Sequence, residues 1–136
     1  MEWKELVAQA FEARKMAYVP YSKFAVGAAL LTKSGKMYLG CNIENAAYSP
    51  TNCAERTAIF KAVSEGEREF SAIAVCGGHD EDTQWCYPCG VCRQVLMEFC
   101  DPDDFIVLVA KSPKEFRKYR LKELLPFGFG PDNLKS

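Results

Sequence analysis

The chain has 136 residues, a length that fits one domain over residues 1–136, and its 49% hydrophobic and 26% charged residues are typical of a globular protein. The formal net charge is -1 and no run of basic residues stands out, which argues against a nucleic acid as the main partner. No apolar run approaches a membrane span and no signal-peptide core follows the first residues, so we expect a cytoplasmic protein without a membrane partner.

The first third of the chain is expected to form a helix and two strands. Apolar residues spaced three and four apart predict an amphipathic helix over residues 2–17, which ends before Pro20. A nearly continuous apolar run predicts a strand over residues 24–32 that is buried on both faces. A hairpin turn containing Gly35 then leads to a second strand over residues 37–42.

The remainder alternates between helices and strands. Thr51 or Asn52 is predicted to cap a helix over residues 53–64, which Gly66 ends. The other expected elements are strands at residues 70–76, 105–110 and 116–120, helices at 90–99 and 121–125, a loop at 77–87 and an irregular tail. Because helices alternate with strands, the pattern predicts an α/β fold, a three-layer sandwich with a mixed sheet.

Seven cysteines are many for a chain of this size. An odd number of cysteines cannot all pair within one chain, so a secreted disulfide framework is the weaker interpretation. Cys89 and Cys92 have the C-x-x-C spacing that is frequent in metal sites. We therefore expect a reducing compartment, with some thiols bound to a metal and the others buried.

Two short motifs contain three thiols and one carboxylate: Cys53-Ala54-Glu55 and Pro88-Cys89-Gly90-Val91-Cys92. Both are predicted to precede helices, and the partial positive charge of a helix start favours the thiolate form that binds zinc. Residues two apart lie on different faces of a helix, so Cys53 and Glu55 reach one metal only if Cys53 is the cap residue. Zinc held by three protein ligands keeps its fourth position for water, which marks a catalytic site.

Three nearby residues have competing interpretations. Cys86 is also spaced C-x-x-C with Cys89, and as a fourth ligand it would close the site and leave Glu55 without a role, so we favour Cys86 as a bystander. His79, the single histidine, falls in a predicted loop and is expected to be solvated, which removes histidine-based triads from the candidate mechanisms. Arg93 fits a solvated helix residue as well as a support for the metal ligands.

In these motifs, and over nearly its whole length, the sequence resembles the small homo-oligomeric cytidine deaminases, which include members with a three-cysteine zinc site. The resemblance implies a five-stranded mixed sheet with helices on both faces. It also implies zinc-dependent hydrolytic deamination of cytidine and 2′-deoxycytidine to uridine and 2′-deoxyuridine, with release of ammonia and Glu55 as the catalytic acid and base. One zinc per chain, with a bound water, would have as its ligands Cys53, Cys89 and Cys92.

The same resemblance implies further roles around the metal. Arg56 would hydrogen-bond the ligand thiolates, Phe24 would stack near the pyrimidine, and Ala54 would offer backbone groups to the base. Asn42 and Glu44 would bind the ribose 3′-hydroxyl, although from the sequence alone they fit a turn asparagine and a surface glutamate. Two rival functions remain: another deaminase of the superfamily, and a non-enzymatic module in which zinc only holds the fold.

The end of the chain suggests assembly. A monomer would expose Phe127 and Phe129, which is an unusual apolar patch. Resemblance implies a homotetramer in which Phe129, or alternatively Phe127, reaches the active site of a neighbouring subunit. Tyr48 matches an interface residue near the ribose in that family.

Overall fold

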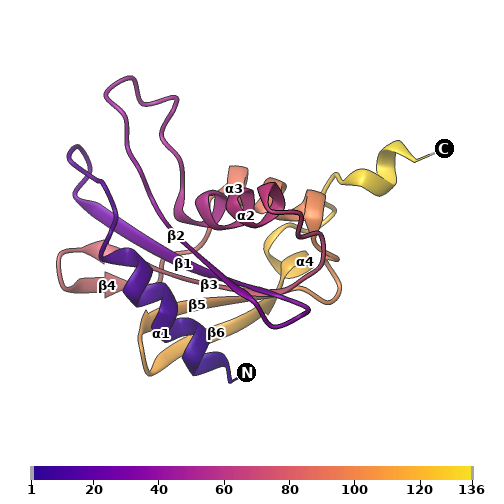
Figure 1. Cartoon of the computed structure of the whole chain (residues 1–136), viewed down its shortest axis with the longest axis horizontal. Coiled ribbons are helices and arrows are strands. Elements are labelled where there is room, and N and C mark those ends of the chain that lie inside the picture. Colours follow the sequence, from indigo (N-terminus) through magenta and orange to yellow (C-terminus); the bar gives the residue numbers. More distant parts are fainter. Residues whose placement is uncertain (1, 136) are drawn as a thin grey trace.

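The computed structural model describes residues 2–135 as a mixed sheet of six strands with helices on both faces (Figure 1). Five strands lie in the order β2-β1-β3-β5-β6, and the short strand β4 pairs with β3. The β3–β5 pair is parallel and the other pairs are antiparallel. The strands are β1 (Phe24–Thr32), β2 (Met37–Cys41), β3 (Phe70–His79), β4 (Asp82–Gln84), β5 (Ile106–Ser112) and β6 (Glu115–Arg120). The predicted five-stranded mixed sheet is confirmed, with one short strand in addition.

The helices form the two outer layers, and each has its own apolar core against the sheet. The helices are α1 (Trp3–Arg14), α2 (Ala54–Ser64), α3 (Gly90–Phe99), α4 (Leu121–Leu124) and a 3-10 turn at Pro131–Leu134. Leu6, Val7 and Ala10 of α1 pack on one face of the sheet, whereas α2, α3 and α4 contribute to the larger core on the other face. The three-layer sandwich is therefore confirmed. Within residues 2–135, no helix has both the length and the apolar character needed to cross a bilayer.

Two glycines let helices approach the sheet closely. A Cβ on Gly27 would lie 2.0 Å from the backbone oxygen of Ala10 in α1, and one on Gly40 would lie 2.3 Å from the backbone oxygen of Ala54 in α2. Both distances are far inside van der Waals contact, so a larger residue would push the helix away. Gly40 in β2 thereby sets the position of the first turn of α2.

Thr51 or Asn52 as the cap of α2 was wrong, whereas the cap that the metal argument required, Cys53, is confirmed. Cys53 occupies the cap position, with extended backbone angles of φ -78° and ψ 156°, and it is followed directly by helix. Asn52 does not cap because its backbone forms a bridge with Ile43 and its side-chain amide donates to Thr57 Oγ1 at 3.1 Å. The end of α2 is as predicted, with Gly66 at φ 99° just beyond the helix.

The predicted loop at residues 77–87 was wrong at residues 77–79 and 82–84, which are strands, and right at the turn between them and at residues 85–87. β3 continues to His79, whose backbone pairs with Phe24 of β1, and the chain then returns as β4. Gly77 and Gly78 suggested a break, but here they allow close approach: a Cβ on Gly78 would lie 2.1 Å from the oxygen of Asp82 in β4. His79 is therefore a strand-end residue, although it is exposed as expected.

Two segments extend beyond this sandwich. Figure 1 shows the connection between β2 and α2 projecting past the sheet, and the residues after α4 leading away from the body. The two helices that begin with the cysteine motifs, α2 and α3, lie together on one face of the sheet.

Candidate metal and active site

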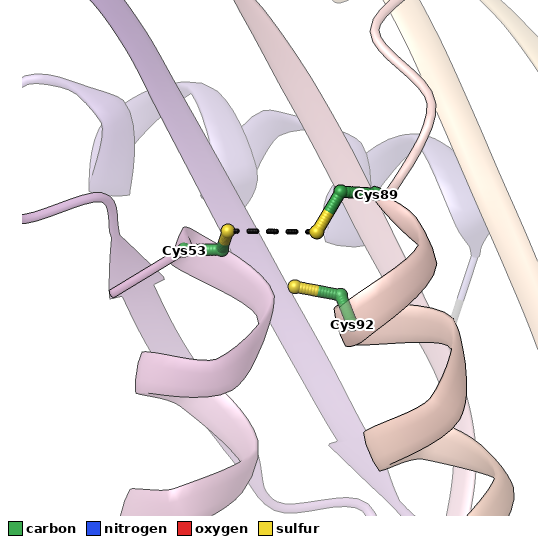
Figure 2. Close-up of side chains that lie close together, drawn as sticks. All are labelled: Cys53, Cys89 and Cys92. Carbon is green, nitrogen blue, oxygen red and sulfur yellow. Dashed lines mark hydrogen bonds between the residues drawn. The ribbon is translucent and has the colours of Figure 1, made fainter. Parts of the chain in front are cut away.

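Three thiols converge between the starts of α2 and α3. Figure 2 shows the sulfur atoms of Cys53, Cys89 and Cys92 pointing toward one another, and all three lie within 4.8 Å of each other. Cys53 Sγ and Cys89 Sγ are 3.7 Å apart, and all seven cysteines are free thiols. Two sulfurs bound tetrahedrally to one zinc at ordinary Zn–S lengths lie about 3.8 Å apart. The thiol cluster therefore fits a single zinc ion.

The two helix starts bring the thiols into this arrangement. Cys53 and Cys89 are both cap residues with extended backbone, at φ -78° and φ -67°, and Cys92 follows in the first turn of α3. Because Cys53 lies outside regular helix, it and Glu55 can face the same site despite their spacing. The unpaired N–H groups and positive ends of two helices favour thiolates here.

Arg56 supplies a full positive charge to the thiols. Its Nη2 donates to Cys53 Sγ at 3.2 Å, and its buried Nε has no hydrogen-bond partner. A hydrogen bond from Cys92, reinforced by the Arg56 guanidinium, lowers the pKa of Cys53 to about 5. The hydrogen bond to Cys53 and burial raise the pKa of Cys92. Three thiolates with Zn²⁺ sum to -1, and Arg56 offsets that charge.

Glu55 is a buried carboxyl group beside the thiols. Its exposed fraction is 4%, and burial, with a smaller contribution from the Cys53 charge, raises its pKa to about 7. A carboxyl group that titrates near neutral pH can both accept and donate a proton there. A zinc ion bound to the thiols would stabilise the carboxylate and move this pKa down. Within residues 2–135, no fourth histidine, cysteine or carboxylate joins the thiol cluster.

A cavity of about 140 Å³ opens beside the thiols and the carboxyl group. It is lined by Val26, Asn42, Cys53, Ala54, Glu55, Cys86, Tyr87 and Cys89. Asn42 lies where β2 ends, and its side-chain amide accepts from Val26 N at 2.9 Å and donates to Phe24 O at 2.8 Å. The amide thus continues the β1–β2 ladder and is held rigidly at the cavity wall.

Glu44 lines a different cavity, of about 430 Å³, together with Tyr48. Its carboxylate accepts hydrogen bonds from the backbone N–H groups of Tyr21 and Ser22, at 3.0 and 3.1 Å, and from the Ser22 hydroxyl. The hydrogen bond from the Ser22 hydroxyl is the main reason that the pKa of Glu44 lies below its usual range. Glu44 is therefore a fixed, ionised acceptor and not a freely solvated side chain.

Three other predicted residues lie outside the thiol cavity of this chain. The ring of Phe24 packs edge-on against His79, with centroids 5.1 Å apart. Phe129 is 56% exposed and its backbone oxygen accepts from Gln94 Nε2 at 2.8 Å, while Tyr48 is 72% exposed on the projecting loop. None of these three aromatic residues lines the thiol cavity of a single chain.

The sequence interpretation missed two residues that line the thiol cavity, Val26 and Tyr87, whereas Cys86, which also lines it, was weighed as a ligand and is a bystander as predicted. Val26 follows Phe24 by two residues on the same strand, a period-two signal that was available in the sequence. Cys86 is a wall residue and not a member of the thiol cluster, and burial raises its pKa to about 12. No local pattern pointed to Tyr87.

Of its two sequence interpretations, Arg93 contradicts the solvated helix residue, and its role as a support for the metal ligands stays a prediction. Its guanidinium is half-buried and binds two backbone oxygens, those of Pro88 and Leu124, each at 2.7 Å. It is therefore not a solvated helix residue, and it does not donate to a thiol.

Comparisons with known proteins agree with this geometry. Residues 1–109 match the family model described as the cytidine and deoxycytidylate deaminase zinc-binding region. The cytidine deaminase of Sporosarcina psychrophila is 48% identical over 98% of this chain and 96% of its own length, and that of Halalkalibacterium halodurans is 47% identical over the full length of both. The crystal structure of cytidine deaminase from Burkholderia pseudomallei superimposes with a TM-score of 0.87, at 45% identity, over 95% of this chain and all of that one.

Proposed function

The chain belongs to the cytidine and deoxycytidylate deaminase family, and we propose that it hydrolyses cytidine and 2′-deoxycytidine to uridine and 2′-deoxyuridine, with release of ammonia. The observation that carries the proposal is the grouping of three free thiols with a buried carboxyl group in one cavity. A zinc that only held the fold would be expected to have four protein ligands and no need of Glu55. The same grouping of three thiols and a carboxyl group therefore argues against a non-enzymatic zinc module.

The residues around the cavity divide the chemistry between them. Cys53, Cys89 and Cys92 would hold the zinc, which would lower the pKa of a bound water toward neutrality. Glu55 is placed to accept one proton of the attacking water and give it to the ring nitrogen N3, and then to move the second proton of the same oxygen to the departing amine. Arg56 donates to Cys53 Sγ and offsets the charge of the ligand thiolates.

The substrate is proposed to occupy both cavities, with its base beside the thiols and its ribose toward Glu44. Ala54 presents backbone groups to the base. The side-chain amide of Asn42, which β1 holds in place, presents its remaining N–H to the ribose 3′-hydroxyl. An ionised carboxylate has about four lone-pair sites, and Glu44 uses three of them within the chain. The fourth is available to a ribose 3′-hydroxyl, and Phe24 is assigned to stacking near the pyrimidine.

We further propose that the active form is a homotetramer whose sites are shared between subunits. Tyr48 and Phe129 are exposed aromatic side chains, and Phe127 is fully exposed with a left-handed backbone at φ 56°. Large apolar groups exposed in this way are typical of contact surfaces. In the proposed assembly, Tyr48 and Phe129 complete the active site of a neighbouring subunit.

A substrate panel tests the function. Cytidine and 2′-deoxycytidine should be turned over, whereas cytidine 3′-monophosphate and cytosine in single-stranded DNA should react little, because a 3′-phosphate has no proton for Glu44 and adds a repelling charge. Glu44→Gln should weaken nucleoside use but leave zinc content unchanged. Glu12→Gln, at an exposed ion pair on α1, is the matched control and should behave as wild type. Equal deamination of an oligonucleotide and of free cytidine would contradict the proposal.

A further inference from the structure

The turn that leads into the metal ligands, residues 85–89, is attached to the C-terminal part of the chain. We call it the ligand turn. The guanidinium carbon of Arg117 in β6 lies 4.0 Å from the centre of the Trp85 ring. The hydroxyl oxygens of Tyr87 and Tyr119, also in β6, are 2.5 Å apart, and Arg117 Nη1 donates to the Tyr87 oxygen at 3.3 Å. Two residues of the ligand turn are thus held by one strand that is distant in sequence.

Arg93 makes the third attachment, at the residue next to a thiol. Its Nε donates to the backbone oxygen of Pro88 and its Nη1 to that of Leu124 in α4, both at 2.7 Å. Pro88 is buried and directly precedes Cys89, while Arg93 directly follows Cys92. The planar fork of an arginine can bind two carbonyls at once in fixed geometry, which a lysine ammonium on its flexible stem cannot reproduce. Arg93 therefore fixes the Pro88 carbonyl relative to both α3 and α4.

The attachments made by Tyr119 and by Arg93 act on different parts of the site. Tyr87 lines the cavity that contains Glu55, so the hydrogen bond to Tyr119 fixes a wall of that cavity. Arg93 acts instead on the spacing between Cys89 and Cys92, since it spans the backbone on either side of them. Neither Tyr119 nor Arg93 lines the cavity or belongs to the thiol cluster.

We propose that β6 and α4 support the ligand turn, with Arg93 as a positioning residue for the metal ligands and Tyr119 as a positioning residue for the substrate-cavity wall. The part that concerns Tyr119 rests on the proposed function, because it is measured with cytidine. The part that concerns Arg93 is measured by metal release and holds whatever the substrate is.

The first experiment compares Arg93→Lys with Arg14→Lys. Arg14 is a matched control because it also binds backbone oxygens, those of Ala25, Gly78 and Asp80, but on the α1 side of the sheet. Release of zinc from the purified protein to a coloured chelator should be about tenfold faster for Arg93→Lys, as is usual when support of a metal ligand is lost. Arg14→Lys should release zinc at the wild-type rate, even where its stability falls. Arg93→Gln provides a second variant if Arg93→Lys does not fold.

The second experiment compares Tyr119→Phe and Tyr87→Phe with Tyr38→Phe. The Tyr38 hydroxyl also donates hydrogen bonds, to Glu65 and Glu67. Tyr38 lines neither the thiol cavity nor the cavity at Glu44, so it is a control for the loss of a tyrosine hydroxyl. The KM for cytidine should rise about fivefold in the first two variants, the effect of one neutral hydrogen bond, with kcat and zinc release unchanged. The double variant should be no worse than Tyr87→Phe, because both single variants remove the Tyr87–Tyr119 hydrogen bond and Tyr87→Phe also removes the acceptor of Arg117 Nη1.

The outcomes separate the two proposals. If wild-type protein does not deaminate cytidine, the proposed function is wrong, while the zinc-release comparison still decides whether Arg93 supports the ligand turn. Equal zinc release from Arg93→Lys, Arg14→Lys and wild type would overturn the role of Arg93. An unchanged KM in Tyr119→Phe, in an enzyme that does deaminate cytidine, would overturn the role of Tyr119.

Discussion

Replacing Gly40 by alanine tests whether the close packing of β2 and α2 sets the active site. The added Cβ would lie 2.3 Å from the oxygen of Ala54 and 2.6 Å from the nitrogen of Ala58. Both obstacles are backbone atoms of α2, so no side chain can rotate out of the way. The first turn of α2, which follows Cys53 and contains Glu55, must move instead.

The size of the effect follows from these distances. Ordinary van der Waals contact begins at 3.4 Å, so the start of α2 must withdraw by about 1 Å. Overpacking of this kind costs about 3 kcal/mol when the backbone has to shift, which lowers the thermal midpoint by about 10 °C in a chain of this length. A misplacement of about 1 Å at reacting groups can reduce turnover by about 100-fold.

Two matched glycine variants make the assay specific. Gly27→Ala meets Ala10 of α1 at 2.0 Å, on the opposite face of the sheet, and should lose comparable stability with little loss of turnover at temperatures where it is folded. Gly90→Ala lies next to Cys89 but meets no atom within 4 Å, and should keep both stability and activity. Thermal midpoint, zinc content and cytidine turnover are measured for all three. The two variants are compared at temperatures where the same fraction of each is folded. Equal turnover of cytidine by Gly40→Ala and Gly27→Ala would then refute the reasoning.

Three further predictions concern chemistry, metal and assembly. Glu55→Ala should lower kcat by about 10²–10⁴-fold, because no other carboxyl group is among the residues that line the cavity, while zinc content stays at the wild-type level; near-normal turnover would exclude Glu55 as the acid and base. Purified protein should carry one zinc per chain, and X-ray absorption should detect three sulfurs and one light atom; four sulfurs would mean a closed site that includes a further cysteine such as Cys86. Sedimentation should detect a tetramer that dissociates when Phe129→Ala and Tyr48→Ala are combined, and full activity in a monomer at assay concentrations would rule out shared sites.

Much of the fold was predictable because short-range patterns control the individual elements. The apolar run of β1 and the three-and-four spacing of α1 were read correctly, apart from the last turn of α1. Gly35 and Gly66 have positive φ, at 96° and 99°, at the turn and the helix end where a glycine was expected. These features depend on neighbouring residues alone.

Elements were misread where distant residues decide the conformation. Gly77 and Gly78 remain extended because they pair with β1 on one side and β4 on the other, although by themselves they suggest a loop. Asn52 offers a good helix cap, but its backbone is already paired with Ile43 across the projecting loop. In both cases a tertiary contact overrides the local preference.

The candidate site shows the same division. The sequence by itself determined which chemical groups are present: two motifs with three thiols and a carboxylate, each at a helix start. Only the tertiary structure decided that the sulfur atoms of Cys53 and Cys89, which are 36 positions apart, lie 3.7 Å from each other. It also decided that Cys86 stays outside the thiol cluster, although it is nearer than Cys89 to Cys53 in the sequence. It also decided that Arg93 binds Leu124, 31 positions away. Such contacts depend on how helices pack on one face of the sheet, because the spacing of residues along a chain contains no information about distances between elements.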